Sequence, residues 1–490
     1  MPGVSGMSVY VPPLRVPLEA WCAWTGQPWE KIRAVVGRSF RMPAPHENVY
    51  TMAAEAVLRL IRRYDVDPRR VGLLALGTES GRDNSAGAVI VRGLVDQALA
   101  RLGLPRLARN CEVPEFKHAC LGGIYALKSA LRYVRGDGAD RAAIVVASDI
   151  AEYARGSSGE QTQGAGAVAM LVEREPKLFA VDLDHAGSAS AYRGPDFRKP
   201  FARHFDTGYA AHLPPGRDFP VFSGKYSTFA YLDEIAHAFD DMLARLRISA
   251  HDFLDGARAL FFHRPYQMMP LQGLAFLYVR ALSASARAGD VLANCCHEAG
   301  LSLQALKSET AAARDLFGEL LQAGKPVDIR PLTGAAASLL RKTDWFRGAA
   351  DRLMGLGHDS VMELGNLYTA ALPAWLAAGL EEADADGIEL DGPMLALGYG
   401  SGDAAESIPL RVVDGWQTAA RKIGARDALA AASFDLDQAQ YEALHDGREA
   451  IGLPPLHKGF SITRVGRDYA DDFQDLGIEY YDYIAVDEGS

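Results

Sequence analysis

The sequence predicts an α/β protein, because short buried strands alternate with amphipathic helices along the chain. Runs rich in β-branched and aliphatic residues are typical of buried strands, at 71–76, 143–147, 168–172, 257–262 and 394–397. Apolar residues at helical spacing lie between or beside these runs, at 49–63, 121–134, 231–246 and 301–321. Alternation of the two kinds of segment indicates the α/β class.

The length of 490 residues fits about three average domains or one enzyme of two fused halves. Glycine-rich polar tips follow strands in both parts of the chain, GTES at 77–80 and GYGSG at 398–402, which favours a duplicated fold. A stretch without periodicity covers 183–217, and a partly helical insertion is expected near 295–360. We therefore predict an N-terminal half over 1–175, a loop-rich connection over 176–225 and a C-terminal half over 226–490.

Composition excludes several classes of protein. With 51 basic and 62 acidic side chains the net charge is −11, so a nucleic-acid partner is not expected. The longest apolar segment, 368–380, is shorter than the roughly 20 residues that cross a bilayer, and it predicts a buried helix rather than a membrane span. No secretion signal is visible at the N-terminus, so we expect a cytoplasmic protein.

The five cysteines are an odd number without a CxxC pair, which argues against a disulfide framework or a zinc ribbon and indicates a reducing compartment. His297 beside Cys295 and Cys296 suggests a metal ligand set, but adjacent cysteines rarely face one ion and a fourth ligand is missing. We therefore expect no metal site.

Cys120 is the candidate nucleophile. It directly precedes the predicted helix 121–134, where the helix dipole is expected to lower the thiol pKa from about 8.5 toward neutrality. The alternative, a small buried core residue, is commoner for an arbitrary cysteine. Gly122 and Gly123 favour the nucleophile, because each glycine costs a helix about 1 kcal/mol and must permit a close approach. His118 is expected to be a packing or cleft-rim residue.

Four further polar residues lie at strand or helix ends. Glu79 follows strand 71–76 and can act as a general base, although an isolated Glu is more often a solvated loop charge. His263 follows strand 257–262, where a structural role is the alternative. Asn366 precedes the apolar helix, and an N-cap role for it or Thr369 competes with a role in the site. Ser401 lies on a glycine-flanked turn whose N–H groups can stabilise an oxyanion.

Together these positions repeat an ordered pattern that resembles the hydroxymethylglutaryl-CoA synthase family of the thiolase superfamily. The matching words, spread over most of the chain, are GTES, ACLGG, VVASDIAEY, GEQTQGAGAVAMLVE, SGKYSTFAYLDE, FHRPY, GNLYTA and YGSG. The resemblance implies an α/β, thiolase-like five-layered αβαβα sandwich of two related halves, usually a homodimer.

The resemblance also implies residue roles. Cys120 matches the acetylated nucleophile, Glu79 the general acid/base, and His263 the group that binds the acetoacetyl substrate. The expected substrate-binding residues are Asn366 and Tyr368 for positioning, Ser401 for the oxyanion hole through its backbone N–H, and Ser227 near the pantetheine tunnel.

The implied reaction condenses acetyl-CoA with acetoacetyl-CoA and water to 3-hydroxy-3-methylglutaryl-CoA and CoA, in the mevalonate pathway of isoprenoid biosynthesis. Coenzyme A thioesters are the substrates, and no tightly bound cofactor is expected. The sequence departs from the family motif FHxPYxKM at Met268, where the family lysine approaches the CoA phosphates, and in the continuation of GTE at 83–86. Either Arg264 replaces the lysine, or an acyl carrier protein delivers the acyl group.

Three alternatives stay open. A β-branching synthase of polyketide assembly would use acyl carrier protein substrates, in keeping with Met268. A type III 3-oxoacyl-ACP synthase shares the Cys, His, Asn arrangement but does not require Glu79. A degenerate thiolase-fold scaffold would not be acylated, although every reactive position here holds a competent side chain.

Overall fold

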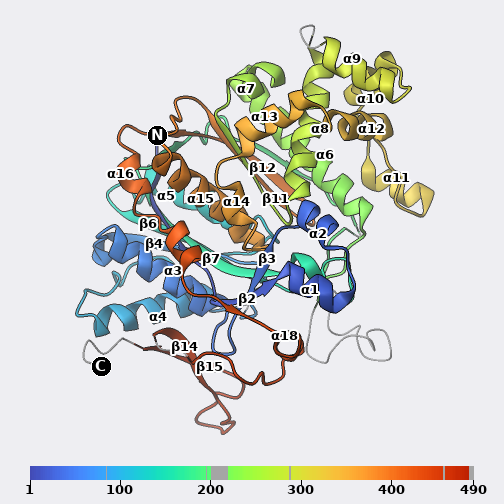
Figure 1. Cartoon of the computed structure of the whole chain (residues 1–490). Coiled ribbons are helices and arrows are strands. Elements are labelled where there is room, and N and C mark those ends of the chain that lie inside the picture. Colours follow the sequence, from blue (N-terminus) through green and yellow to red (C-terminus); the bar gives the residue numbers. More distant parts are fainter. Residues whose placement is uncertain (84, 195, 200–218, 286–288, 456–457, 485–490) are drawn as a thin grey trace.

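The computed structural model describes residues 1–83, 85–194, 196–199, 219–285, 289–455 and 458–484. Within them, ten strands form one sheet in the order β10-β11-β12-β8-β1-β7-β6-β4-β5, with β9 paired to β12 (Figure 1). The strands are β1 (Gly3–Tyr10), β4 (Val71–Gly77), β5 (Glu115–Phe116), β6 (Ala142–Ala151), β7 (Gly164–Glu173), β8 (Phe179–Val181), β9 (Gly187–Ser190), β10 (Ala259–Phe262), β11 (Met394–Gly400) and β12 (Ala404–Val412).

The sheet consists of two parts that are covered by helices on both faces. Helices α3 (Val49–Arg63) and α4 (Gly87–Arg101) lie on the outer face of the β1, β7, β6, β4 part, and α5 (Gly122–Arg135) covers its inner face. Helix α15 (Ala371–Ala385) contacts strands of both parts, while α6 (Lys225–Leu246) covers the outer face of β9, β11 and β12. The layers therefore follow the expected αβαβα order, and the fold is thiolase-like.

The two parts of the sheet are joined by hydrogen-bonded strands rather than being separate. Gly3 and Val4 of β1 pair with Ala180 and Phe179 of β8, and β8 continues to β12. This connection was not predicted, because the three residues of β8 give too short a pattern to recognise in the sequence.

The predicted elements agree well with the structure at the centre of the fold. The helix expected at 49–63 is α3, and the strands expected at 71–76 and 394–397 are β4 and β11. The apolar segment 368–380 is buried in the core, as expected. The predicted helix 301–321 is wrong as one element: it is divided into α10 (Leu303–Ala311) and α11 (Leu316–Ala323). Much of the loop predicted at 183–217 lies outside the described residues.

The stretch expected to be an insertion forms a helical layer at one end of the molecule (Figure 1). It comprises α9 (Gly289–Glu298), α10, α11, α12 (Pro331–Leu340) and α13 (Asp344–Met354), near α8 (Met268–Ala284) and α7 (Ala250–Gly256), whereas α14 (His358–Val361) packs on α15. Cys295 and Cys296 are buried in α9. Across the described residues there is no cluster of three or more potential metal-ligating side chains.

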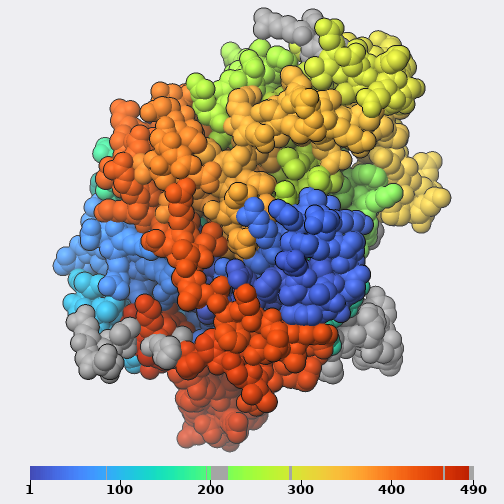
Figure 2. All heavy atoms as spheres, in the orientation of Figure 1, coloured from blue at the N-terminus to red at the C-terminus, as the bar shows by residue number. Residues whose placement is uncertain are grey.

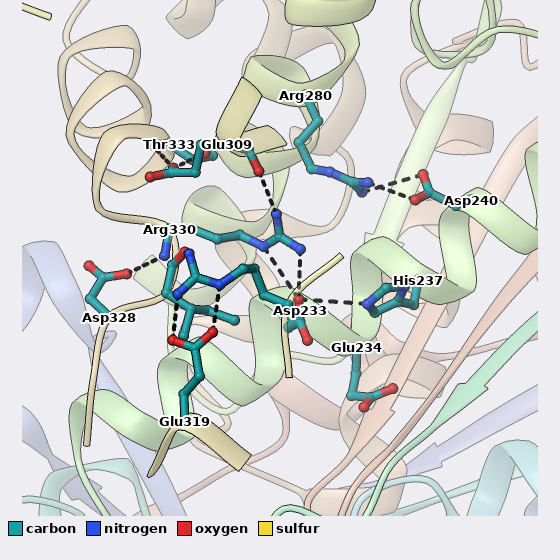
Figure 3. A network of polar contacts seen from close by, with 12 residues as sticks. Asp233, Glu234, His237, Asp240, Arg280, Glu309, Glu319, Asp328, Arg330 and Thr333 are labelled. Atoms are coloured by element: carbon teal, nitrogen blue, oxygen red, sulfur yellow. Dashed lines mark hydrogen bonds and ion pairs between the residues drawn. The ribbon is translucent and has the colours of Figure 1, made fainter. Parts of the chain in front are cut away.

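A buried polar network attaches this helical layer to α6 (Figure 3). The Arg330 guanidinium contacts the Asp233 carboxylate of α6 at 3.3 Å and donates to the Glu309 carbonyl at 3.2 Å. The Glu309 carboxylate accepts hydrogen bonds from the backbone N–H and hydroxyl of Thr333 at the start of α12. On the other side of Asp233, Arg193 bridges Asp233 and Glu234.

The C-terminal residues lie against the N-terminal part of the chain, as Figure 2 shows with red atoms directly below blue ones. The hairpin of β14 (Gly459–Val465) and β15 (Glu479–Ile484) packs on α3 and α4. β13 (Phe434–Asp435) adds to β2 (Leu14–Pro17), which pairs with β3 (Ser39–Met42). The remaining helices are α1 (Leu18–Thr25), α2 (Trp29–Val35), α16 (Gln417–Ala420), α17 (Ala425–Ala430) and α18 (Gln438–His445). No helix in the described part of the chain has the length and apolar character of a membrane span.

Candidate active site

The site begins where β4 and α5 meet closely. A side-chain carbon added to Gly77 would lie 2.4 Å from the Gly123 Cα, and one added to Gly122 would lie 2.7 Å from the Phe116 carbonyl oxygen. No larger residue fits at these positions without moving backbone atoms. The expectation that the glycines beside Cys120 permit a close approach is therefore confirmed.

Cys120 lies between these elements and is half-buried, whereas the other four cysteines are buried. It follows Ala119, whose φ of 39° is unusual for a residue with a side chain and marks local strain. The thiol packs against a small cluster that contains Tyr153 and Tyr368, with Phe197 at its edge. The sulfur is therefore held by aromatic rings but is not sealed in the core.

The prediction of a lowered thiol pKa at Cys120 is wrong. Burial raises the pKa well above the usual value, and the nearby carboxylates of Glu79, Asp149 and Asp196 raise it further. Helix α5 begins only at Gly122, with Leu121 as its N-cap, so the dipole acts from one residue further on than expected. The resting thiol is thus protonated and needs a base to become a nucleophile.

Asp149, at the end of β6, organises the backbone around the site. Its Oδ1 accepts from the N–H groups of Glu79 and Ser80, each at 2.8 Å, and from the Thr78 hydroxyl at 2.9 Å. Its Oδ2 accepts the Thr369 N–H at 3.0 Å. One buried carboxylate therefore fixes the GTES turn to the GNLYT segment, and burial raises its own pKa.

Glu79 projects from this turn toward the nucleophile. Its Oε1 lies 3.3 Å from the Lys199 Nζ, and its side chain is 8 % exposed. The negative charge of Glu79 raises the pKa values of Cys120, Tyr153 and Tyr368, so these groups share one environment. The alternative of a solvated loop charge does not hold for a carboxylate this deeply buried.

The altered continuation of this turn has a structural role. The Asp83 carboxylate accepts from the N–H groups of Ser85 and Ala86, each at 2.8 Å, at the start of α4. Asn84 lies outside the described residues. Asp83 thus orders the segment that leads from the GTES turn into α4.

The GNLYT segment supplies a second wall. Asn366 is 1 % exposed; its Oδ1 accepts the Tyr368 N–H at 2.9 Å, and its Nδ2 lies 3.4 Å from the Tyr153 hydroxyl. Tyr368 has a φ of 43°, which turns its ring toward Tyr153. The N-cap alternative for Asn366 fails, because α15 begins five residues later at Ala371 and has no side-chain cap.

The end of β11 forms the third side of the site. A side-chain carbon on Gly400 would lie 2.7 Å from the Leu121 Cβ and 2.8 Å from the His118 carbonyl oxygen, so this strand end rests on the nucleophile loop. Ser401 is half-buried on the turn that follows. The His118 ring packs edge-on against Tyr125, with 5.6 Å between centroids, in keeping with the predicted packing role.

His263 follows β10, the strand beside β11. Its N–H donates to the Leu397 carbonyl at 2.8 Å, and its ring faces the Tyr399 ring, with centroids 6.4 Å apart. Burial lowers the imidazole pKa to about 3, so the ring is neutral at physiological pH. Its Nδ1 has no hydrogen-bond partner among the described residues. A neutral imidazole with a free nitrogen can accept or donate a hydrogen bond to a ligand.

Two predicted substrate contacts are less directly connected to the site. Arg264 is 5 % exposed, and its guanidinium donates to the Val361 carbonyl at 2.7 Å; burial lowers its pKa to about 9. This placement does not support a phosphate contact by Arg264. Arg341 instead lies beside Met268, with 2.9 Å between its Nη1 and the Sδ. Ser227 is in the first turn of α6, where its hydroxyl accepts the Ser223 N–H at 3.3 Å.

Several residues of the site were not found in the sequence. Asp149, Tyr153 and Lys199 lie in or near words that carry the resemblance or in the aperiodic loop, yet nothing in their spacing indicates that they face Cys120. Asp149 ends a strand, as Glu79 does, and this position was the available signal. Lys199 is brought to Glu79 by a long loop whose path the sequence does not predict.

Comparison with known proteins shows which family this chain resembles. Residues 2–177 match the family model described as hydroxymethylglutaryl-coenzyme A synthase N terminal. A hydroxymethylglutaryl-CoA synthase of Haloferax volcanii is 27% identical over 452 residues, covering 91% of each chain. One from Enterococcus faecalis is 30% identical over 274 residues, covering 56% of this chain and 63% of the relative.

Solved structures give the same result over nearly the whole chain. MvaS in complex with 3-hydroxy-3-methylglutaryl coenzyme A superposes with a TM-score of 0.75 at 25% identity, covering 99% of both chains. The curacin biosynthetic pathway HMG synthase in complex with acetyl donor-ACP gives a TM-score of 0.68 at 19% identity, covering 99% of this chain and 100% of the other, which supports the fold. Residues 2–177 therefore match the hydroxymethylglutaryl-CoA synthase family, and the whole chain resembles solved members of that family in fold.

Proposed function

We propose that this enzyme condenses acetyl-CoA with acetoacetyl-CoA and water to give 3-hydroxy-3-methylglutaryl-CoA and CoA through an acetyl-Cys120 intermediate. The observation that carries the proposal is the half-buried Cys120 beside the carboxylate of Glu79, in a chain whose residues 2–177 match this family. Relatives that are named hydroxymethylglutaryl-CoA synthases support it.

The first step is transfer of the acetyl group to sulfur. Because the thiol pKa is raised, a base must take the proton as the sulfur attacks the thioester carbon and CoA leaves. In this proposal the carboxylate of Glu79 or the neutral imidazole of His263 takes this proton.

The second step forms the carbon–carbon bond. Glu79 removes a proton from the acetyl methyl group, and the resulting carbon nucleophile attacks the ketone carbon of the acetoacetyl thioester. His263 donates a hydrogen bond to the ketone oxygen as negative charge develops there. Backbone N–H groups near Ser401 stabilise the enolate oxygen, a contribution of roughly 3 to 4 kcal/mol per donor in comparable sites. Water then hydrolyses the Cys120 thioester.

Asn366, Tyr368 and Ser227 position the substrate in this proposal. Asn366 accepts the Tyr368 N–H and its Nδ2 lies within hydrogen-bond distance of the Tyr153 hydroxyl, and these contacts support a positioning role for the segment beside Cys120. Ser227 lies five residues beyond Phe222, which packs against the Tyr153 ring at the edge of the same cluster.

The substrate carrier is a CoA thioester in the main proposal. Arg341 supports it, because this cation lies beside Met268 and no carboxylate partner is found for it in the described ranges. Delivery by an acyl carrier protein is the second candidate, favoured by the absence of the family lysine at Met268 and by the fold shared with the curacin synthase. We further propose a homodimer, a cytoplasmic location and the division into halves given above.

The test is consumption of acetoacetyl-CoA by the purified protein. Loss of acetoacetyl-CoA that depends on acetyl-CoA, with formation of 3-hydroxy-3-methylglutaryl-CoA, would support the main proposal. Turnover only when the acyl groups are loaded on a carrier protein would favour the second candidate. Absence of turnover with both carriers would contradict both.

A further inference from the structure

Three buried side chains at the end of β11 form an acidic cluster that the proposed reaction does not use. The Tyr399 hydroxyl lies 2.7 Å from Asp403 Oδ1 and 3.2 Å from Asp196 Oδ2. All three residues are at most 4 % exposed. The cluster joins β11 and the turn after it to the loop that carries Asp196.

The hydrogen bonds of this cluster do not satisfy both carboxyl groups. Asp403 Oδ1 also accepts the Gly402 N–H at 2.7 Å, but Asp403 Oδ2 and Asp196 Oδ1 have no donor among the described residues. Tyr399 has one hydroxyl proton and can donate to only one acid at a time. Two carboxylates that share a buried site cannot both be ionised without a large penalty, and a proton held between them supplies the missing donor.

The electrostatics of the cluster agree with this reading. Burial and the neighbouring Asp196 raise the pKa of Asp403 to about 8. Burial, and then the charges of the same two acids, raise the pKa of Tyr399 well above its usual value. The proton is therefore retained at neutral pH and lost in mildly alkaline solution.

The cluster is coupled to the nucleophile in two ways. The charge of Asp196 is one of those that oppose ionisation of Cys120. In addition, the backbone of Gly400, next to Tyr399, rests on the His118–Leu121 loop that carries the thiol. A change in the charge of the pair thus acts on the thiol through space and through this contact.

We propose that Asp403 is a positioning residue that shares one proton with Asp196, and that this proton limits the negative charge facing Cys120 and holds the Gly398–Gly402 turn against the nucleophile loop. The effect of this proton on the reaction at Cys120 rests on the proposed function. The shared proton itself does not, because it can be detected without substrate.

Other charged and titratable groups around the pair do not replace this proton. Arg198 passes beside Gly402 and stacks over Tyr192, but it forms no ion pair with either acid among the described residues. Tyr226 of α6 donates its hydroxyl to the Arg193 carbonyl at 2.8 Å. Arg193 itself is bound to Asp233 and Glu234. Beyond Tyr399 lies the neutral His263, and on the side of Cys120 lie Glu79 and Asp149, which are both acids.

The test compares thiol reactivity with pH in the wild type and Asp403→Asn. The amide keeps the shape of the acid, can donate to Asp196 and cannot lose a proton. We expect the ratio of iodoacetamide alkylation rates at Cys120, variant over wild type, to rise by at least ~3-fold between pH 7 and pH 9, because only the wild type gains a charge. Cys120→Ser gives the background from other cysteines, and Asp414→Asn, which changes an exposed carboxylate, is the matched control.

Thermal unfolding gives a second readout. An acid with a raised folded pKa stabilises the folded state fully only at low pH, and this contribution is lost as pH rises toward about 8. The melting temperature of Asp403→Asn relative to the wild type is therefore expected to rise between pH 5 and pH 8 by at least ~2 °C. Asp196→Asn also removes one of the two acids that share the proton, and it replaces Asp403→Asn in this test if that variant does not fold.

The outcomes are distinct. Alkylation ratios and melting differences that do not change with pH, or that match those of Asp414→Asn, would overturn the shared proton. A pH-dependent ratio in a protein that fails to condense acetyl-CoA with acetoacetyl-CoA would support the pair while contradicting the proposed function.

Discussion

Replacing Asp149 by Asn should separate the role of the site's framework from that of its reacting groups. Asp149 Oδ1 accepts four hydrogen bonds, two from N–H groups and two from hydroxyls, and Oδ2 accepts the Thr369 N–H. In the variant one oxygen is replaced by an NH2 group that faces a backbone donor. Leaving one buried donor unsatisfied costs about 1–3 kcal/mol, and four bonds change from charge-assisted to neutral, at about 1 kcal/mol each.

Removing a buried carboxylate also relieves its desolvation, which offsets part of this loss. We therefore expect Asp149→Asn to lower the free energy of unfolding by about 2–4 kcal/mol, measured by urea denaturation. A shift of Glu79 by about 1 Å would lower kcat by roughly 100-fold. Asp435→Asn, which breaks an exposed ion pair with Arg15, is the control and should cost under about 1 kcal/mol. A loss for Asp149→Asn no greater than that of the control would refute this account.

Three further changes test individual groups. Arg341→Ala should raise KM for CoA thioesters several-fold with a smaller effect on kcat, because the guanidinium beside Met268 is the cation proposed to meet a substrate phosphate; an unchanged KM would exclude this contact. His263→Asn should reduce the stability that the protein loses between pH 7 and pH 4.5, measured by urea unfolding. In the wild type the buried imidazole, with its pKa lowered to about 3, stays neutral over this range, whereas the same side chain in the unfolded chain binds a proton below about pH 6.5, so the folded state is destabilised as the pH falls. Equal losses in the variant and the wild type would show that His263 titrates normally. Glu79→Gln should abolish condensation while acetylation of Cys120 continues, measured by product formation and by mass spectrometry; full condensation in the variant would favour the type III synthase alternative.

The sequence was sufficient to predict those residues of the site whose position depends on a single strand or helix. Gly122 and Gly123 indicated a close approach at the start of the helix, because glycine lacks the side chain that would block it, and the structure shows that β4 is the element that approaches. Glu79 and His263 were recognised because each follows a short buried strand whose end is well defined. The ordered words of the resemblance then supplied roles that the spacing alone does not give.

The parts that escaped prediction depend on contacts between distant segments. The pKa of Cys120 was predicted from its helix alone, whereas burial and three acids from other segments determine it. Two of these acids, Asp149 and Asp196, belong to segments that reach the thiol only after folding. Arg341 was likewise invisible, because it lies 73 residues from Met268 in the chain.

The most direct test of the account is mass spectrometry of the protein after brief incubation with acetyl-CoA alone. The account predicts an increase of about 42 Da that maps to the peptide containing Cys120 and is absent in Cys120→Ser. Loss of this adduct on addition of acetoacetyl-CoA would complete the expected cycle. An unmodified Cys120, or an adduct on another residue, would contradict the claim that this thiol carries the acyl group.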